Sequence, residues 1–537
     1  MTLSRRRFLG QGARLGLLPF IPACGESAGG DGGACCTGSV GTFQHGVASG
    51  DPLADAVILW TRVTLPDAAD SVTAVDVEWR LASDPGMTQL VASGTAQTDA
   101  ESDYTVKVDA AGLEPGTTYY YDFGAFEVRS RVGRTKTLPS GDASRARLAV
   151  ASCANYPAGF FNVYAAIAAR SDLDLVLHLG DYLYEYANGT FGDGASIDRL
   201  PEPDRELVSL DDYRARHAQY KRDSDLQEMH RQHPLLAVWD DHEVSNNGFR
   251  DGAGNHQPDS EGDWQDRKQS AMRAYFEWMP IRPSAPGDVQ HIYRRFTYGG
   301  LFDLLLLDTR YVGRDPRIST SCDRVGIEDS ARSLLGADQE AWLFDALTTS
   351  KARGASWRLV AQQVMMGQLS DVSKGCVTHP DQWDGYAPSR ARFLGLLRDE
   401  AIDNVVVLTG DAHSSWAFDL TDNPFDAAAY DAASGQGSLA VEFVAPSVSS
   451  PASFVADGES PATHPHLKYI DLVRHGYVLV DVTRERVQAE WYYVSSVLQP
   501  GADEALGASF RVLAGQNCLV PAEQATEANE AAAALAP

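Results

Sequence analysis

Residues 404–416 read NVVVLTGDAHSSW, a run of apolar and β-branched side chains that gives way to a glycine, an acid and an imidazole. Such a short apolar run is typical of a strand buried on both faces, as in the central sheet of an α/β protein. Ligands of open α/β sheets bind at the carboxyl ends of the strands. We therefore expect Asp411 and His413, which follow this strand, to belong to a functional site.

Five more segments between residues 146 and 366 share this pattern. They read ARLAVASC (146–153), LDLVLHLGDYLYEY (173–186), HPLLAVWDDHEVSNN (233–247), LFDLLLLDTRY (301–311) and SWRLVAQQVMM (356–366). The polar residues that follow the apolar runs are Cys153; Asp181, Tyr182, Tyr184 and Glu185; Asp240, Asp241, His242 and Glu243; Asp308 and Arg310; Gln362 and Gln363. Segments 267–278 and 338–347 have helical spacing and are expected to cover the sheet. The pattern predicts an α/β fold with one polar cluster at the strand ends.

The predicted cluster holds more carboxylates than could lie together without cations. Neighbouring buried carboxylates raise one another's pKa values and are costly to desolvate. Aspartate oxygens suit Ca²⁺, Mg²⁺ or Mn²⁺, whereas a thiolate, a phenolate and an imidazole favour a more Lewis-acidic transition metal. We expect two different metals, bridged by Asp181 on its Gly-Asp turn. Taken singly, such residues usually cap helices, form turns or pack in the core, but their joint occurrence favours a metal site.

Segment 42–140 shows short alternating runs separated by Gly, Pro and Asp turns. This period-two pattern predicts a small β-sandwich, and the corner LEPGTTYYY (113–121) resembles fibronectin type III domains. Residues 141–145 would be the hinge to a second domain, 146–500, in which a hairpin after residue 467 edges the sheet. Segment 501–537 is expected to end in a tail, from about residue 521, that is disordered or a loose helix, because its last residues are of low complexity.

The N-terminus resembles an export signal. SRRRFLG (4–10), followed by a mildly apolar stretch, is a twin-arginine pattern, and IPACG (21–25) resembles a lipoprotein cleavage box. We expect residues 1–24 to be a signal for the twin-arginine export machinery and 25–41 to be a flexible tether. The protein would then be periplasmic, cell-surface or secreted, with a lipid on Cys24 as its only link to a membrane. An N-terminal amphipathic helix is the alternative.

Charge restricts the partners. Lys plus Arg is 45 and Asp plus Glu is 73, so the formal charge is 45 − 73 = −28, which would repel a polyanion. A nucleic-acid scaffold is therefore not expected, and an anionic substrate would need local positive charge from metal ions or arginines. The chain has seven cysteines, an odd number that leaves at least one lipidated, unpaired or a ligand. Cys322 and Cys376 lie in loop-like stretches and could form a disulfide.

Together with VEFVAPSVSS (441–450) and HGYVLVDVT (475–483), these motifs closely resemble the alkaline phosphatase D family, the PhoD-like branch of the metallophosphoesterases. The resemblance covers roughly residues 42–500, including the small N-terminal β-domain. It implies a four-layer α/β/β/α catalytic domain that holds one Fe³⁺ and one or two Ca²⁺ ions. It also implies hydrolysis of small phosphate mono- and diesters outside the cytoplasm.

The resemblance also implies which residues bind the metals. The iron ligands would be Cys153, Tyr184, Asp181 and His413, with Asp181 bridging, and the calcium ligands Asp411 with one or both of Asp240 and Asp241. The wider superfamily has an Asn-His pair where this chain has Asp241-His242, and a Gly-His-x-His where it has Gly410-Asp411-Ala412-His413. Both departures introduce carboxylates, which suit calcium.

The expected reaction is in-line attack on phosphorus by a metal-activated hydroxide, with both cations holding phosphate oxygens. The expected catalytic residues are Asp181, His242 and Arg310. His242 would stabilise the transition state or protonate the leaving oxygen. Arg310 would make a bidentate phosphate contact, or else pair with Asp308 or a helix end.

Two other functions stay open. One is a dizinc or dimanganese phosphodiesterase that acts on phospholipids or nucleotides. The other is a non-catalytic, calcium-stabilised surface lipoprotein that binds sugars or anions. Adhesion, however, has no need of a thiolate, a phenolate and an imidazole that converge on one point.

Overall fold

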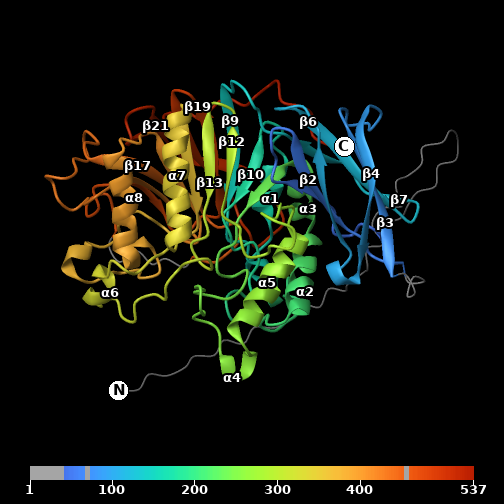
Figure 1. Cartoon of the computed structure of the whole chain (residues 1–537), viewed down its shortest axis with the longest axis horizontal. Coiled ribbons are helices and arrows are strands. Elements are labelled where there is room, and N and C mark those ends of the chain that lie inside the picture. The colour runs from blue at the N-terminus through green and yellow to red at the C-terminus, as the bar shows by residue number, and fades with distance from the viewer. Residues whose placement is uncertain (1–40, 67–72, 453–458) are drawn as a thin grey trace, which may run out of the picture. The chain divides into compact units, whose positions relative to one another are not determined.

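The computed structural model describes residues 41–66, 73–452 and 459–537. The predicted signal, most of the tether and Cys24 lie outside these residues. Within the described ranges the strands form three sheets, and helices flank the two larger ones (Figure 1). No helix in this part of the chain combines the length and apolar character that a membrane crossing requires.

The two large sheets have ten and seven strands. The ten-stranded sheet runs, in spatial order, β22 (Leu519–Pro521), β21 (Glu504–Leu513), β20 (Arg486–Val494), β19 (Gly476–Thr483), β9 (Arg145–Ala151), β10 (Leu175–His178), β11 (Pro234–Ala237), β1 (Val47–Gly50), β2 (Ala56–Arg62) and β5 (Thr105–Ala111). The seven-stranded sheet runs β12 (Arg294–Tyr298), β13 (Phe302–Leu306), β14 (Trp357–Gln362), β15 (Val405–Thr409), β17 (Ser438–Val444), β16 (Ser415–Thr421) and β18 (Leu467–Asp471).

The middle of each large sheet is parallel. Strands β9, β10, β11 and β1 pair in parallel in one sheet, and β13, β14, β15 and β17 do so in the other. Parallel neighbours have their carboxyl ends at the same edge of a sheet, and helical crossovers join them. This arrangement confirms the predicted α/β class and explains why six separate motifs can reach one site.

Side chains alternate between two hydrophobic clusters along the strands of the seven-stranded sheet. Val406 and Leu408 of β15 belong to the cluster that also holds the side chains of β9 and β10. Val405 and Val407 belong to a second cluster, together with side chains of α7 (Ala337–Arg353) and α8 (Ala387–Asp399). The two large sheets therefore pack face to face, while α7 and α8 cover the outer face of the seven-stranded sheet (Figure 1).

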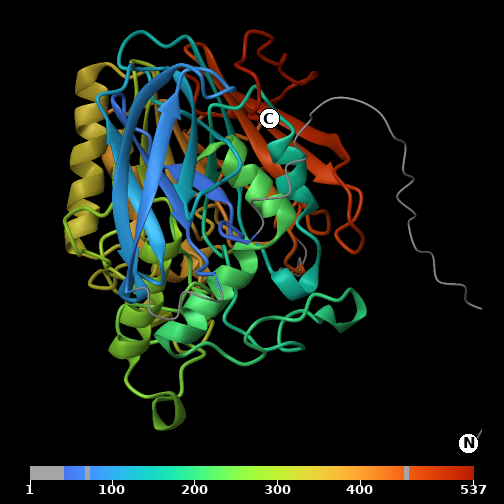
Figure 2. The same ribbon diagram turned by 90° about the vertical axis from the view of Figure 1, so that its right-hand side faces the viewer.

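A second set of helices packs against the ten-stranded sheet. α1 (Asn162–Ala168) contacts β20, and α3 (Ser224–Gln232) contacts α1 and β1. The remaining helices are α2 (Leu210–Lys221), α4 (Pro258–Glu261), α5 (Trp264–Trp278) and α6 (Arg324–Glu328). The predicted helical segments 267–278 and 338–347 fall inside α5 and α7. In Figure 2 the yellow α7 lies at the left, and the red C-terminal strands of the ten-stranded sheet lie at the right.

Helix starts in this layer follow ordinary capping chemistry. Ser209 and Asp212 form a capping box at the start of α2, and the carboxylates of Asp223 and Asp263 accept backbone N–H groups at the starts of α3 and α5. Such caps satisfy amides that have no partner within the helix. The helix positions are therefore specified locally as well as by packing.

The N-terminal β-region shares a sheet with the rest of the protein. β1 pairs with β11, so β1, β2 and β5 extend the ten-stranded sheet. A smaller sheet holds β4 (Leu90–Asp99), β3 (Ala74–Ala82), β6 (Thr118–Ala125), β7 (Val128–Arg129) and β8 (Gly133–Lys136). A Cβ at Gly50 would overlap the carbonyl oxygens of Pro280 and Leu235, so the close approach of β1 requires glycine there. The alternation of apolar and polar residues predicts which face of a strand is buried. It does not predict which strands pair, and so the pairing of β1 with β11 could not be seen in the sequence.

The C-terminal segment corrects two sequence-based expectations. The hairpin β19–β20 lies inside the sheet, because β19 pairs with β9 and the strands β21 and β22 continue the sheet past residue 500. The tail from about residue 521, expected to be disordered or a loose helix, has no helix in the structure and is held by hydrogen bonds. The tail takes part in these bonds through its backbone oxygens, so its amino-acid composition does not predict them.

Arginines hold this tail at two points, Glu527 and Pro537. The carbonyl of Glu527 accepts hydrogen bonds from Arg145 and Arg147. The carbonyl of Pro537 accepts one from Arg231 at 2.8 Å. Arg147 and Arg231 are buried, so these bonds satisfy donors that water reaches poorly.

Deletion of residues 522–537 should destabilise the protein. Each buried charged donor left without its acceptor costs about 1–3 kcal/mol, which corresponds to a drop of several degrees in the midpoint of thermal unfolding. Calorimetry of the purified proteins measures it. Glu527→Ala, which keeps the backbone carbonyl, is the control and should unfold like the wild type. An unaltered midpoint after the deletion would show that the tail contributes nothing.

Candidate metal centre

The metal ligands predicted at the strand ends lie in or next to one cavity of about 400 Å³. Asp181, Asp241, His242, Asp411 and His413 line it. Cys153, Tyr184 and Asp240 are buried next to these lining residues. Ligand atoms of three groups lie within 4.8 Å of one another: Cys153 with Asp181 and His413; Asp181 with Asp241 and His242; Asp240 with Asp241 and Asp411. The geometry thus brings together all the predicted metal ligands.

Four of these residues have strained backbones. The φ angles of Cys153, Asp181, Asp411 and His413 are 63°, 53°, 59° and 51°, in the left-handed region that costs a residue with a side chain about 1–3 kcal/mol. Gly180 has a φ of 101°, and a Cβ there would overlap the backbone of Asp240. These strand-end turns are therefore tight, and they place Asp181, Asp411 and His413 in the cavity wall.

Tyr184 joins the thiol-and-imidazole side of the site. Its hydroxyl lies 2.9 Å from Asp181 Oδ2 and 2.9 Å from His413 Nε2. The Nδ1–H of His413 donates to the carbonyl of Pro451 at 2.7 Å, which leaves Nε2 as an acceptor. One hydroxyl proton cannot serve two acceptors. A cation among these atoms would satisfy all of them, and the fixed tautomer of His413 is the one that a metal requires.

The cluster also contains carboxylate oxygens without a hydrogen-bond partner. Among the described residues no partner exists for the buried atoms Asp181 Oδ1, Asp240 Oδ2 and Asp241 Oδ1. The second oxygen of Asp240 accepts from Arg310, and that of Asp241 accepts from the amide of Asn247 at 2.6 Å. Buried anionic oxygens without partners are costly. Each carboxylate is thus oriented by the protein through one oxygen and offers the other, which fits a multivalent cation.

The pKa values in the cluster also reflect an excess of buried acidic groups over cationic ones. Burial raises the pKa of Asp241 to about 6 and that of Asp240 well above its usual value, although Arg310 opposes both shifts. Burial and the neighbouring Asp181 raise the pKa values of Cys153 and Tyr184. The protein alone therefore keeps the thiol and phenol protonated, and a bound cation would be needed to ionise them.

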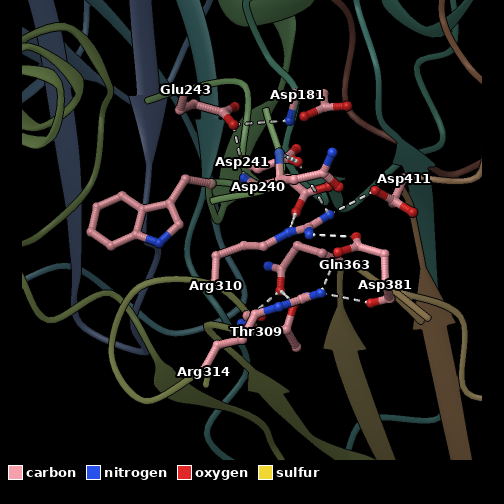
Figure 3. A network of polar contacts seen from close by, with 12 residues as sticks. Asp181, Asp240, Asp241, Glu243, Thr309, Arg310, Arg314, Gln363, Asp381 and Asp411 are labelled. Atoms are coloured by element: carbon pink, nitrogen blue, oxygen red, sulfur yellow. Dashed lines mark hydrogen bonds and ion pairs between the residues drawn. The ribbon is translucent and has the colours of Figure 1, made fainter. Parts of the chain in front are cut away.

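Arg310 lies among three carboxylates (Figure 3). Its Nε donates to Asp240, its Nη1 to Asp381 at 2.7 Å and its Nη2 to Asp411 at 2.7 Å. The side chain is fully buried and does not line the cavity. Asp308 instead accepts the amides of residues 310 and 311. The structure corrects both expectations for Arg310, because its guanidinium faces carboxylates and neither the cavity nor Asp308.

Three other strand-end residues serve the loops rather than the cavity. Asp308 forms a turn and accepts the indole N–H of Trp239 at 3.0 Å. Gln363 accepts from the amide of Thr309, and Gln362 donates to Thr409. These contacts are the ordinary structural roles that such residues have when taken singly.

Two buried glutamates, which the sequence analysis did not single out, orient the site. Glu185 accepts from His242 Nδ1 at 2.7 Å. Glu243 accepts from the amides of Asp181, Tyr182 and Asp240, at 3.1, 2.6 and 2.8 Å. Both lie in the motifs that carry the predicted ligands, so their position was visible in the sequence. Their partners were not, because the bonds join different loops.

The third residue that sequence reasoning missed is Asp381. It lies in a long loop without a strand signal, and its carboxylate pairs with Arg310 and Arg314. The disulfide between Cys322 and Cys376, expected as a possibility, is present and ties this loop to the segment before α6. One wall of the cavity is therefore covalently cross-linked.

Comparison with known proteins identifies the family. Residues 148–491 match the family described as "PhoD-like phosphatase", and residues 37–139 match its N-terminal domain. This chain belongs to the PhoD-like phosphatase family. Alkaline phosphatase D of Bacillus subtilis (strain 168) is 35% identical over 523 residues, which cover 91% of this chain and 86% of that protein.

A solved structure of PhoD matches with a TM-score of 0.80 and 34% identity, covering 90% of this chain and 93% of that one. These findings confirm the resemblance seen in the motifs. The chain is accordingly a hydrolase of phosphate esters.

Replacement of Glu243 should weaken metal retention. Glu243→Gln keeps the size of the side chain but loses acceptor strength for the turns at Asp181 and Asp240, and loss of such an outer contact typically costs 10- to 100-fold in metal affinity. Metal content per chain after dialysis against graded chelator measures it.

Glu442→Gln is the matched control. Glu442 is also buried and accepts the amides of Met366 and Gly367, but it touches no candidate ligand. It should lower the unfolding temperature without altering metal retention. Equal retention in both variants would refute the role of Glu243.

Proposed function

We propose that this chain is an exported phosphatase and phosphodiesterase with a centre of one Fe³⁺ and one or two Ca²⁺ ions. The observation that carries the proposal is the set of buried carboxylate oxygens without partners, next to a thiol, a phenol and an imidazole acceptor. Cys153, Tyr184 and His413 would hold the iron, and Asp240, Asp241 and Asp411 the calcium, with Asp181 between them.

Cations held there would supply positive charge beside the phosphoryl oxygens and make a nearby water more acidic. His242 is the candidate proton donor. Burial lowers its pKa, but Glu185 and Asp181 raise it well above the usual value. With Nδ1 bound to Glu185, His242 lines the cavity and would present Nε2 to the leaving oxygen as the proton donor.

An aromatic side chain shields the imidazoles. The ring of Phe191 lies 5.7 Å from that of His413 and 6.4 Å from that of His242, at angles of 30° and 7°. Phe191 and Tyr186 both line the cavity. They exclude water from one side of the reacting groups, which strengthens the electrostatic interactions inside.

Export is proposed on two grounds. The twin-arginine pattern at residues 4–10 is one, and the Cys322–Cys376 disulfide, which is typical of oxidising compartments, is the other. A lipid on Cys24 would anchor the chain. The α/β/β/α layer order and the likeness of the N-terminal β-region to fibronectin type III domains are part of the same proposal. The face-to-face packing of the large sheets and the helices outside them support the layer order.

Purified protein with iron should absorb visible light through phenolate-to-iron charge transfer, and Tyr184→Phe should lose that band. Tyr182→Phe is the control, because the Tyr182 hydroxyl contacts His230 and not the cluster. Absorption spectra with elemental analysis measure both. A colourless, iron-free protein that is fully active with zinc or manganese would favour the dimetal phosphodiesterase instead.

A further inference from the structure

The segment after β13 carries three arginines, at positions 310, 314 and 317. We propose that Arg317 is the arginine that contacts the substrate, through an anionic group on its alcohol part, while Arg310 positions metal ligands. The substrates would then be phosphate esters that carry a second anion, either a carboxylate or a phosphate. This inference rests on the proposed phosphatase function.

Arg310 and Arg314 are not available to a substrate. Three nitrogens of Arg310 are bound to the carboxylates of Asp240, Asp381 and Asp411, and the side chain is fully buried. Arg314 is also buried and donates to Asp381 and to the carbonyl of Thr309. Two of these partners, Asp240 and Asp411, are candidate calcium ligands, so Arg310 is placed to orient ligands and its guanidinium does not line the cavity.

Arg317 has the opposite surroundings. It is exposed and lines the cavity, as no other lysine or arginine in the described part of the chain does. It has no hydrogen bond or ion pair to any residue that the structure describes. Burial raises the pKa of Asp381, but nearby arginines lower it to about 2. The largest of these effects come from Arg314 and Arg310, and a smaller one comes from Arg317. Arg317 is therefore close enough to act on charges in this wall of the cavity.

The backbone around Arg317 is anchored on both sides. The carbonyl of Pro316 accepts from Arg332 at 2.8 Å, and Ile318 is buried with Ile327 and Val377. The Cys322–Cys376 disulfide and a hydrogen bond from the amide of Val377 to Ser321 at 2.7 Å join this segment to the loop that carries Asp381. A long cationic side chain thus starts from a fixed point at the mouth of the cavity.

The positions of the acidic and basic side chains in the cavity indicate which part of the substrate Arg317 would contact. Asp181 and Asp241 are buried, and with Asp411 they would bind the cations that hold the reacting phosphoryl group. Arg317, in contrast, is exposed. An arginine there suits a planar carboxylate or a phosphate on the remainder of the ester.

The test compares two esters with the same carbon skeleton. 3-Phosphoglycerate carries a carboxylate where glycerol 3-phosphate carries a hydroxymethyl group. Wild-type protein should prefer 3-phosphoglycerate in kcat/KM, and Arg317→Gln should reduce that preference about tenfold, mainly through KM, as expected for loss of one charge-assisted hydrogen bond. Arg317→Lys should restore part of it.

Arg324→Gln is the control for charge, because Arg324 is exposed at the start of α6 but pairs with Glu328 and does not line the cavity. It should keep the wild-type preference. An unchanged preference in Arg317→Gln, or an equal loss in Arg324→Gln, would overturn the assignment of Arg317.

Arg310→Lys tests the other half of the inference. Lysine keeps the charge but cannot span three carboxylates, so metal retention should fall at least tenfold. Full metal content with a raised KM would show that Arg310 contacts substrate and would overturn the inference. If Arg310→Lys does not fold, Asp381→Asn, which removes one partner of Arg310, provides the metal measurement.

Failure of the phosphatase proposal can be told apart from failure of this inference. If wild-type protein loaded with iron and calcium hydrolyses neither of these esters and no p-nitrophenyl phosphate mono- or diester, the phosphatase proposal fails. Equilibrium dialysis of both compounds against wild type and Arg317→Gln then decides on Arg317. The assignment of Arg317 is supported if wild type binds 3-phosphoglycerate more tightly than glycerol 3-phosphate and Arg317→Gln does not. It is refuted if both proteins bind 3-phosphoglycerate equally well.

Discussion

The concentration of buried negative charge at the strand ends is the constraint on which the rest of the structure depends. Asp181, Asp240 and Asp241 are almost completely buried, and each has one oxygen without a partner among the described residues. Arg310 compensates part of this charge. Desolvated carboxylates are tolerated only when they are paired or bind metal. The carboxylates at the carboxyl ends of the strands would therefore be stabilised by multivalent cations.

Both halves of the fold contribute to that edge. Cys153, Asp181 and Asp240 follow strands of the ten-stranded sheet, whereas Asp411 and His413 follow β15 of the seven-stranded sheet. Hydrogen bonds between loops then orient the side chains, as Glu243 does for two turns at once. Residues that touch neither metal nor substrate are therefore as necessary to the site as its ligands, because a misdirected carboxylate is a lost ligand.

The sequence predicted the α/β class and the gathering of the ligands, because parallel strands share an edge and polar residues after an apolar run must lie on it. It did not predict that the guanidinium of Arg310 faces carboxylates, because one of them, Asp381, lies 71 residues away in a loop. The ordered tail was missed for a related reason, since its contacts use the carbonyls of Glu527 and Pro537. Pairing between distant loops leaves no periodic signal.

The most direct test of the cation requirement is a crystal structure of active protein with anomalous scattering measured at the iron edge and at long wavelength for calcium. We predict an iron peak about 2.0–2.6 Å from ligand atoms of Cys153 and His413, and a calcium peak at similar distances from Asp240 and Asp241. Fully active crystals with only water beside these side chains would contradict the account.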